Sequence, residues 1–326
     1  NPPNLAFLPA DRHLSVANVF VHDEIALREN LEGALGVKLE RNSYTGWDFM
    51  PSARLGWSAT RNDFLWAAWS RAVRTPARID RELFIPGTPP FLLAGGPQFD
   101  SEISHVYELG YRTQPASSVS FSATAFYHDH QELRSVAPGP PAATVQNDQE
   151  GHTKGIEMWG AWRVVERWRV SAGYTRLDTR LRVRPGAVNL QPPSDIGSDP
   201  REWWTFRSAL DLGESWELDL MVRHHGALAN RNVPAYTAAD ARLGWRYSRQ
   251  LELALLLQRT GRSQAAHVEV GRCRARSAVR PASRLRSWNT YPTTRRRSTA
   301  RPPPFRLVRA GSWGLVPRRP SVPPVR

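Results

Sequence analysis

The stretch 118-SVSFSATAFY-127 decides how the chain folds. Its odd positions carry valine, phenylalanine, two alanines and tyrosine, whereas its even positions carry three serines, threonine and one phenylalanine. A period of two is that of a β-strand, because successive side chains of a strand point to opposite sides of the sheet. The stretch therefore predicts a strand with one face in an apolar medium and the other in a polar one.

The same alternation recurs along the first 271 residues and predicts about twelve antiparallel strands. We expect them at 15–27, 31–42, 48–58, 64–74, 102–113, 117–130, 153–163, 168–181, 202–213, 216–227, 236–247 and 251–260. Each is longer than the five or six residues usual in globular sheets, and long enough to cross a bilayer at a tilt.

The expected connections alternate in length. Short ones fall near 28–30, 60–63, 114–116, 165–167, 213–215 and 248–250, and long ones at 75–101, 131–152 and 182–201, with shorter ones on that same side near 42–47 and 228–235. Short turns on one side and long loops on the other are typical of an outer-membrane β-barrel. The sequence thus predicts an all-β, antiparallel transmembrane barrel fragment with short periplasmic turns and long outer loops.

A soluble β-sandwich would also alternate, but two features favour the membrane. The polar face keeps charges of both signs in mid-strand, which a wet lumen accepts and a packed core does not: Lys38, Arg54, Glu108, Glu157, Arg163, Asp219 and Arg242. Aromatic residues gather toward strand ends, as at a membrane interface: Trp47, Trp57, Trp69, Tyr111, Trp162, Trp168, Trp204, Trp216, Trp245 and Tyr247.

Several phrases of residues 20–271 resemble, in order, the barrel of TonB-dependent outer-membrane receptors. They are 35-LGVKLERNSYTG-46, 51-PSARLGW-57, 65-LWAAWSRAVRTPARIDREL-83, 99-FDSEISHVYELGYR-112, 125-AFYHDHQELRS-135, 155-GIEMWGAW-162, 172-AGYTRLDT-179, 233-VPAYTAADARLGW-245 and 267-HVEVG-271. The resemblance implies a barrel of 22 strands in the Gram-negative outer membrane, filled by an N-terminal plug that engages the TonB complex.

By that resemblance, residues 1–14 are an irregular lead-in and residues 15–271 are part of the barrel, without the plug or the closing strand. His267–Gly271 would lie in the outer loop before that last strand. The implied function is energised uptake of a scarce solute, such as an iron–siderophore or vitamin, with membrane lipid around the barrel. The alternative within barrels is a passive porin, because porins share the lumen and loops.

The basic character of the chain belongs to its last 55 residues. Segment 272–326 holds 15 arginines and neither lysine nor acidic residues, and the remainder sums to −1 although the whole chain carries +14. An arginine-rich arm that binds nucleic acid is one interpretation. We favour a disordered Arg/Pro-rich tail read out of frame, and expect no nucleic-acid partner. Translating the downstream gene in the other frames tests this, since one of them should encode an alternating strand with a terminal aromatic residue.

The sequence contains no motif of a catalytic or phosphate-binding site, so we expect neither an enzyme nor a cofactor. His128 and His130, like the pair His224–His225, lack a third ligand at a fixed spacing, and we interpret them as rim histidines rather than a metal site. Ligand contacts are expected in loop 75–101, because ligands are usually met on loops of a rigid scaffold. The candidates there are Arg78, Asp80, Arg81 and Glu82.

Overall fold

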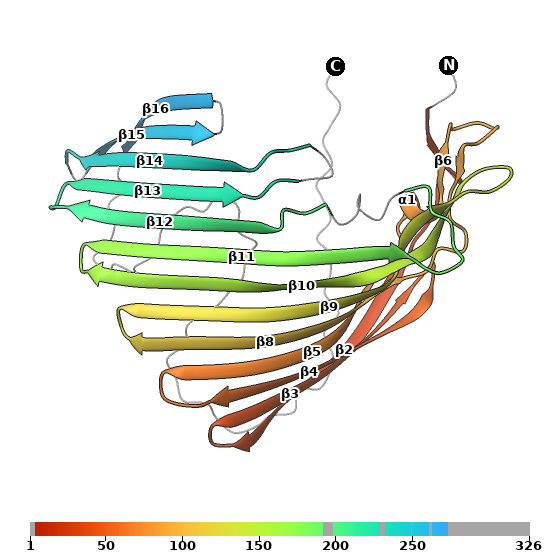
Figure 1. Ribbon diagram of the computed structural model, residues 1–326, viewed down its shortest axis with the longest axis horizontal. Helices are drawn as coiled ribbons and strands as arrows, with labels where there is room; N and C mark the ends of the chain where they lie inside the picture. The colour runs from red at the N-terminus through yellow and green to blue at the C-terminus, as the bar shows by residue number, and fades with distance from the viewer. Residues whose placement is uncertain (1–3, 192–197, 229–231, 249, 261–262, 273–326) are drawn as a thin grey trace, which may run out of the picture. The chain divides into compact units, whose positions relative to one another are not determined.

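One antiparallel sheet of thirteen strands dominates the computed structural model, which describes residues 4–191, 198–228, 232–248, 250–260 and 263–272 (Figure 1). Its strands are β2 (Val16–Arg28), β3 (Leu31–Asn42), β4 (Gly46–Ser58), β5 (Asp63–Arg74), β8 (Glu102–Ala116), β9 (Val119–Ala137), β10 (Thr144–Val165), β11 (Trp168–Val183), β12 (Glu202–Leu212), β13 (Trp216–His225), β14 (Tyr236–Arg246), β15 (Leu251–Thr260) and β16 (Ser263–Arg272). Each pairs with the strand before and after it in the sheet, so β2 and β16 form its two ends within the described residues.

The twelve strands predicted from the alternation are confirmed, and a thirteenth follows them. Strand β16 pairs with β15 in an unbroken register from Thr260–Ser263 to Leu251–Arg272. The placement of His267–Gly271 in an outer loop was therefore wrong. Their alternation of polar residues with valine is itself a strand pattern, and a two-residue connection is enough for an antiparallel hairpin. The tail predicted for 272–326 lies outside the described residues from 273 onward.

The alternation of connection lengths is also confirmed, with the short turns at one end of the strands and the long loops at the other (Figure 1). Segment 131–152, however, is mostly strand rather than loop, because β9 continues to Ala137 and β10 begins at Thr144. The pairing of these two strands is irregular there, with shifts on either side of Gln149. Such bulges let a strand continue while its side chains change direction.

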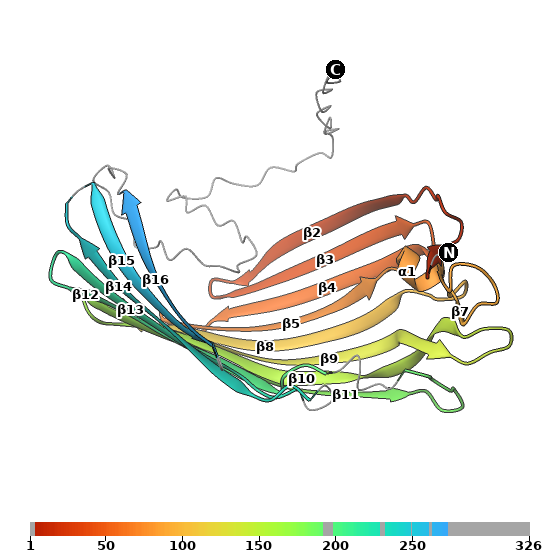
Figure 2. The same cartoon turned by 90° about the horizontal axis from the view of Figure 1, so that it is seen from above.

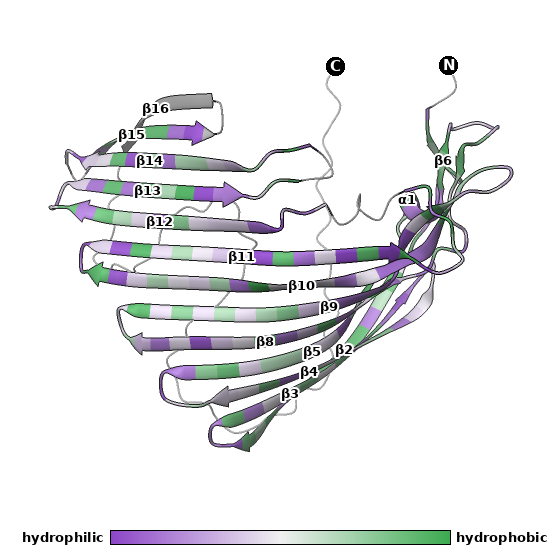
Figure 3. Cartoon of the chain, in the orientation of Figure 1, coloured by the Kyte–Doolittle hydropathy of each residue, from purple (hydrophilic) through white to green (hydrophobic). Residues whose placement is uncertain are grey.

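The register places the apolar positions of neighbouring strands side by side. Leu109 lies opposite Ala67 and Ala125, and Leu220 lies opposite Ser208 and Ala241. The hydrophobic and hydrophilic residues that alternate along many strands (Figure 3) thus fall on two continuous faces, an apolar face and a polar face. Large side chains of the apolar face are exposed, as expected for a surface that meets lipid: Leu35, Phe49, Leu55, Trp57, Leu109, Phe121, Phe206, Leu220, Leu243, Leu255 and Leu257.

The sheet is a single curved layer, so its hydrophobic core is small (Figure 2). The buried apolar residues among those described are Phe99, Ala142, Val145, Ala238 and Ala254. Three of these belong to the connections and strand starts at the long-loop end. Close packing of the ordinary kind is therefore found at that end rather than between the strands.

A small three-stranded sheet and one turn of helix stand at the long-loop end (Figure 1). The sheet joins β1 (Ala6–Phe7), β6 (Leu83–Ile85) and β7 (Leu93–Ala94), and the helix is α1 (Arg78–Arg81). The lead-in expected at 1–14 thus contains a short strand that pairs with loop 75–101. No helix in the described part of the chain has the length and apolar composition needed to span a membrane.

The two faces predict opposite effects for neighbouring substitutions in β9. Ala125→Arg adds a charge to the apolar face, and we expect a loss of about 2–4 kcal/mol when the protein is inserted in phosphatidylcholine vesicles. Thr124→Arg adds the same charge to the polar face and is the matched control, expected to change stability by less than about 1 kcal/mol. Urea unfolding in vesicles measures both, and equal losses would contradict the assignment of the faces.

Candidate ligand-binding site at the long-loop end

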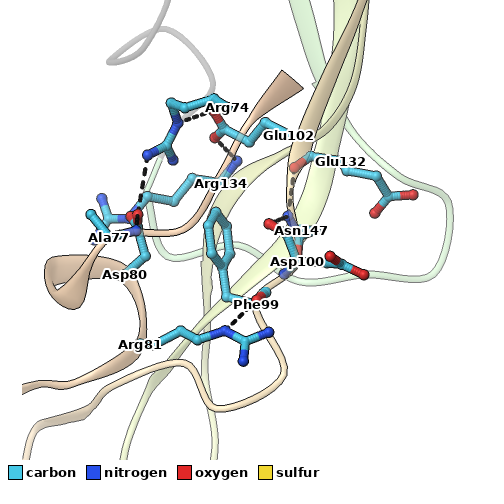
Figure 4. A network of polar contacts seen from close by, with 10 residues as sticks. All are labelled: Arg74, Ala77, Asp80, Arg81, Phe99, Asp100, Glu102, Glu132, Arg134 and Asn147. Atoms are coloured by element: carbon cyan, nitrogen blue, oxygen red, sulfur yellow. Dashed lines mark hydrogen bonds and ion pairs between the residues drawn. The ribbon is translucent and has the colours of Figure 1, made fainter. Parts of the chain in front are cut away.

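Asp80 is the centre of a buried polar cluster that joins loop 75–101 to three strand ends (Figure 4). Its side chain is 2% exposed and accepts a hydrogen bond from the Ala77 amide at 2.9 Å. Arg74 Nη1 lies 3.1 Å from one carboxylate oxygen, and Arg134 Nε lies 3.3 Å from the other. Arg74 also binds Glu102, whose other oxygen accepts the Arg134 amide at 2.8 Å. A buried carboxylate is stable only when it is paired in this way.

Glu82 forms a second anchor, between the loop and the N-terminal segment. Its buried carboxylate lies 2.6 Å from Arg78 Nε, 2.7 Å from Arg12 Nη1 and 2.9 Å from the Tyr44 hydroxyl, which donates a hydrogen bond. Burial alone would raise the pKa of Glu82, but the hydrogen bonds from Arg78 and Tyr44 and the charge of Arg12 outweigh it, and the pKa lies below its usual value. Burial, with the hydrogen bond to Glu82, raises the pKa of Tyr44.

Arg81 and Phe99 connect the two ends of loop 75–101 in its buried interior. Arg81 donates to the Phe99 carbonyl at 2.7 Å and to the Tyr44 carbonyl at 3.1 Å, so its guanidinium links the beginning and end of the loop to 43–45. The Phe99 ring is fully buried. Gly96 permits this packing, because a Cβ there would stand 2.5 Å from the Val145 carbonyl oxygen.

The loop is also fixed to the start of β10. Val145 donates its amide to the Gly95 carbonyl at 2.9 Å, and Asn147 accepts the Asp100 amide at 2.6 Å. The Asn147 amide in turn donates to the Glu132 carbonyl at 2.6 Å (Figure 4). The connections at 4–14, 43–45, 75–101 and 138–143 are therefore held together as one packed assembly.

The four candidate residues Arg78, Asp80, Arg81 and Glu82 come together in this assembly, and they contact either other parts of it or the adjoining ends of β5 and β9. Arg78 completes the set, since it donates to the Pro9 and Ala10 carbonyls and stacks over the Phe7 ring at 4.9 Å. Whether any of the four touches a ligand stays a prediction. Their partners Arg12, Tyr44 and Arg134 were not among the candidates, because they lie far away in sequence and only the fold brings them near.

A second group of charges occupies the polar face near the short-turn end. Arg242 lies 3.2 Å from Asp219 and 3.4 Å from Glu217, and it also binds Glu252. Arg246 reaches Glu217 at 2.6 Å. These ion pairs connect β13, β14 and β15 across a face that a solvated lumen suits better than a packed core.

The histidines singled out in the sequence make hydrogen bonds and ring contacts with neighbouring side chains. His130 is placed between Ser104 and Thr153, with hydrogen bonds of 3.2 and 3.1 Å, one to each ring nitrogen. His224 bonds to Thr237 at 2.9 Å, and His225 stacks on Tyr236. Within the described residues, no group of three or more histidine, cysteine or acidic side chains is arranged to hold a metal ion.

A long, one-layer antiparallel sheet with an apolar outer face, a charged inner face and packed loops at one end defines the wall of a transmembrane β-barrel. The family described as TonB-dependent receptor-like, beta-barrel matches residues 1–257. The chain belongs to this family, as its sequence phrases indicated.

Solved structures of siderophore receptors share the fold. The siderophore receptor PirA from Pseudomonas aeruginosa aligns with a TM-score of 0.59 and 17% identity over 79% of this chain and 46% of its own. A mutant of the ferric enterobactin receptor PfeA from the same organism, in complex with enterobactin, gives 0.60 and 17% over 75% and 40%. The alcaligin receptor FauA from Bordetella pertussis gives 0.58 and 15% over 79% and 44%. The chain thus spans less than half the length of these receptors.

The packing of Phe99 predicts how firmly the loop is held. Phe99→Ala removes a fully buried aromatic side chain at the loop end, and we expect a loss of about 3–5 kcal/mol in the local stability of loop 75–101. Leu92→Ala, in the same loop but 75% exposed, is the matched control and should change little. Amide hydrogen exchange across 75–101 measures both, and equal protection in the two variants would contradict the role of Phe99.

The lowered pKa of Glu82 predicts an acid-sensitive loop. Because this pKa is depressed in the folded protein, the stabilisation is complete above the ordinary glutamate value of about 4.5. It is lost as the pH falls through the depressed pKa. The protection factors of the amides in 75–101, corrected for the intrinsic exchange rate at each pH, should therefore fall on acidification more than those in β12 and β13. In Glu82→Gln the loop should be weakened already at neutral pH and lose this pH-dependent step. If the pH-dependent loss of loop stability were the same in Glu82→Gln as in the wild-type protein, a group other than Glu82 would be responsible for it.

Proposed function

We propose that the chain is the C-terminal part of the barrel of an outer-membrane receptor that imports a scarce solute in a TonB-dependent manner. The observation that carries this proposal is the apolar face of the thirteen-stranded sheet, along β3, β4, β5 and β8 to β14. On the central strands, the apolar-face positions between the aromatic rows of the two ends carry no charge, for example Leu109 in β8 and Ala123 and Ala125 in β9. Only a hydrocarbon medium requires a sheet to expose such a band.

The receptor function is supported by the loop end. This end carries buried carboxylates, cation–aromatic contacts and glycine-dependent packing that hold four connections together. Order of this kind reduces the entropy lost when a loop surface binds a solute. PfeA is solved with enterobactin bound and FauA is an alcaligin receptor, so an iron–siderophore is the class of solute we propose first.

Arg78, Asp80, Arg81 and Glu82 take the role of positioning residues in this proposal. Their charged groups form ion pairs and hydrogen bonds that hold the loop. The surface available to a solute comes from neighbouring residues whose side chains are exposed. Ile79 and Leu92 are such neighbours, with 53% and 75% of their surface exposed. Energy would reach the site through a plug domain and the TonB complex in the Gram-negative envelope, as in the family to which the chain belongs.

The test uses cells that lack their own siderophore receptors and carry the complete reading frame containing this chain. We expect uptake of labelled iron from ferric enterobactin or ferric alcaligin, and its loss when TonB is deleted. Asp80→Asn should weaken solute binding about tenfold or more, because even about 1.4 kcal/mol of lost loop order has that effect. Glu166→Gln, at the opposite end and 90% exposed, is the control that should bind normally.

The same experiment can instead identify the protein as a porin. Solute entry that persists without TonB, with ion conductance in planar bilayers, would contradict the receptor proposal and establish a passive channel. Specific binding that Asp80→Asn leaves unchanged would retain the receptor but remove its ligand site from this loop.

A further inference from the structure

The apolar face ends, toward the long loops, in a row of aromatic side chains. Its members come from five strands: Trp69, Tyr107, Tyr127, Tyr174 and Trp204. Tryptophan and tyrosine with one apolar side and one polar end favour the depth of lipid headgroups. The row therefore marks where the hydrocarbon ends on the side of the long loops.

The next positions toward the loops, on the same face, are rich in cationic and histidine side chains. We name this set the outer belt: Arg71 of β5, His105 of β8, His152 and Lys154 of β10, and Arg176 and Arg180 of β11. The register keeps the set on one face, since Arg71 lies opposite His105 and His152 opposite Arg180. Asp129, Asp178 and Glu202 are the acidic residues among them.

Histidines on this face pack against aromatic rings of the neighbouring strand in a repeated arrangement. His105 stacks on Trp69 at 6.3 Å and 13°, and His152 on Tyr127 at 5.5 Å and 22°. Farther along the sheet, His224 stacks on Trp204 at 5.7 Å and 14°. Each pair places a ring nitrogen beside an interfacial aromatic residue, so hydrogen-bond donors accompany the row over a wide part of the sheet.

Two cations of the outer belt have no side-chain partner in the part of the chain that the structure describes. Lys154 and Arg176 are exposed and make no side-chain hydrogen bond or ion pair within the described residues. They lie on adjacent strands, Lys154 opposite Asp178 and Arg176 opposite Ile156, so they are diagonal neighbours on one face. Side chains so placed have their Cβ atoms about 7 Å apart, close enough for one anion to contact both.

The acidic neighbours of these two cations are engaged elsewhere. Asp178 binds Arg180 at 2.9 Å, and Glu202 accepts a hydrogen bond from the Tyr174 hydroxyl at 3.4 Å. Two unpaired cations side by side repel each other, and their long stems can carry them along the apolar surface toward the headgroups. An external anion at that depth would stabilise both.

We propose that the outer belt binds the phosphate groups of lipids in the outer leaflet, with Lys154 and Arg176 as the principal contacts. The inference rests on the proposed membrane function, since it needs the apolar face to lie in lipid. Lysine and arginine both bind phosphate, arginine through a bidentate fork and lysine as a point charge. The flanking tyrosines hold the site at headgroup depth.

The test titrates the detergent-solubilised full chain with phosphatidic acid and counts bound lipids by native mass spectrometry. The variant Lys154→Gln/Arg176→Gln removes both cations. Its matched control, Arg54→Gln/Arg207→Gln, removes two cations of the polar face and the same total charge. We expect the affinity for phosphatidic acid to fall about fivefold for each belt cation, or about 25-fold in the double variant. The control should stay within about twofold of the wild-type protein.

Three outcomes overturn the proposal. Equal losses in the two double variants would mean that only net charge matters, and equal binding of oleic acid and phosphatidic acid would remove the preference for phosphate. Displacement of the lipid by millimolar inorganic phosphate would make the site one for the free ion. Insertion of the wild-type chain into phosphatidylcholine vesicles separates these results from failure of the proposed function, because a chain that never inserts would contradict both.

Discussion

The structure depends on one constraint. Hydrocarbon offers no hydrogen-bond partners, so the backbone amide and carbonyl groups of a chain that lies in it must bond to one another. An antiparallel sheet does this between neighbouring strands, and here each of the thirteen strands is bonded to the next one in the sheet. The pairing also fixes the register, and the register turns the alternation of single strands into two continuous faces. A shift by one residue would exchange those faces along a whole strand.

A one-layer sheet leaves little room for a conventional core, and the long-loop end supplies it instead. Phe99, Asp80 and Gln149 are among the few large side chains that are completely buried, and all belong to that end. Water is excluded there by the loops themselves, so polar groups must find partners inside. Asp80 and Glu82 find them in arginines from strand ends and from the N-terminal segment, and in this way their charges order the loop surface.

Much of the wall could be predicted from the sequence because its signal is local. A period of two needs only a few consecutive residues, so the strands and the side of the long loops follow from patterns such as 118-SVSFSATAFY-127. Strand β16 was missed because its five-residue phrase 267-HVEVG-271 was assigned by family order rather than by its own alternation. The strand extensions around Gln149 were missed because bulges break the period that identifies a strand.

By itself, the sequence determined the two-faced strands, their order and the family, since each depends on residues that are neighbours in the chain. It also drew attention to Arg78, Asp80, Arg81 and Glu82, but not to the side chains that they contact. Only the tertiary structure decided those contacts, because Arg12 and Tyr44 lie on other connections and Arg134 lies in β9, and all three meet the loop through long-range packing. The same holds for Lys154 and Arg176, which become neighbours only when β10 and β11 pair in register.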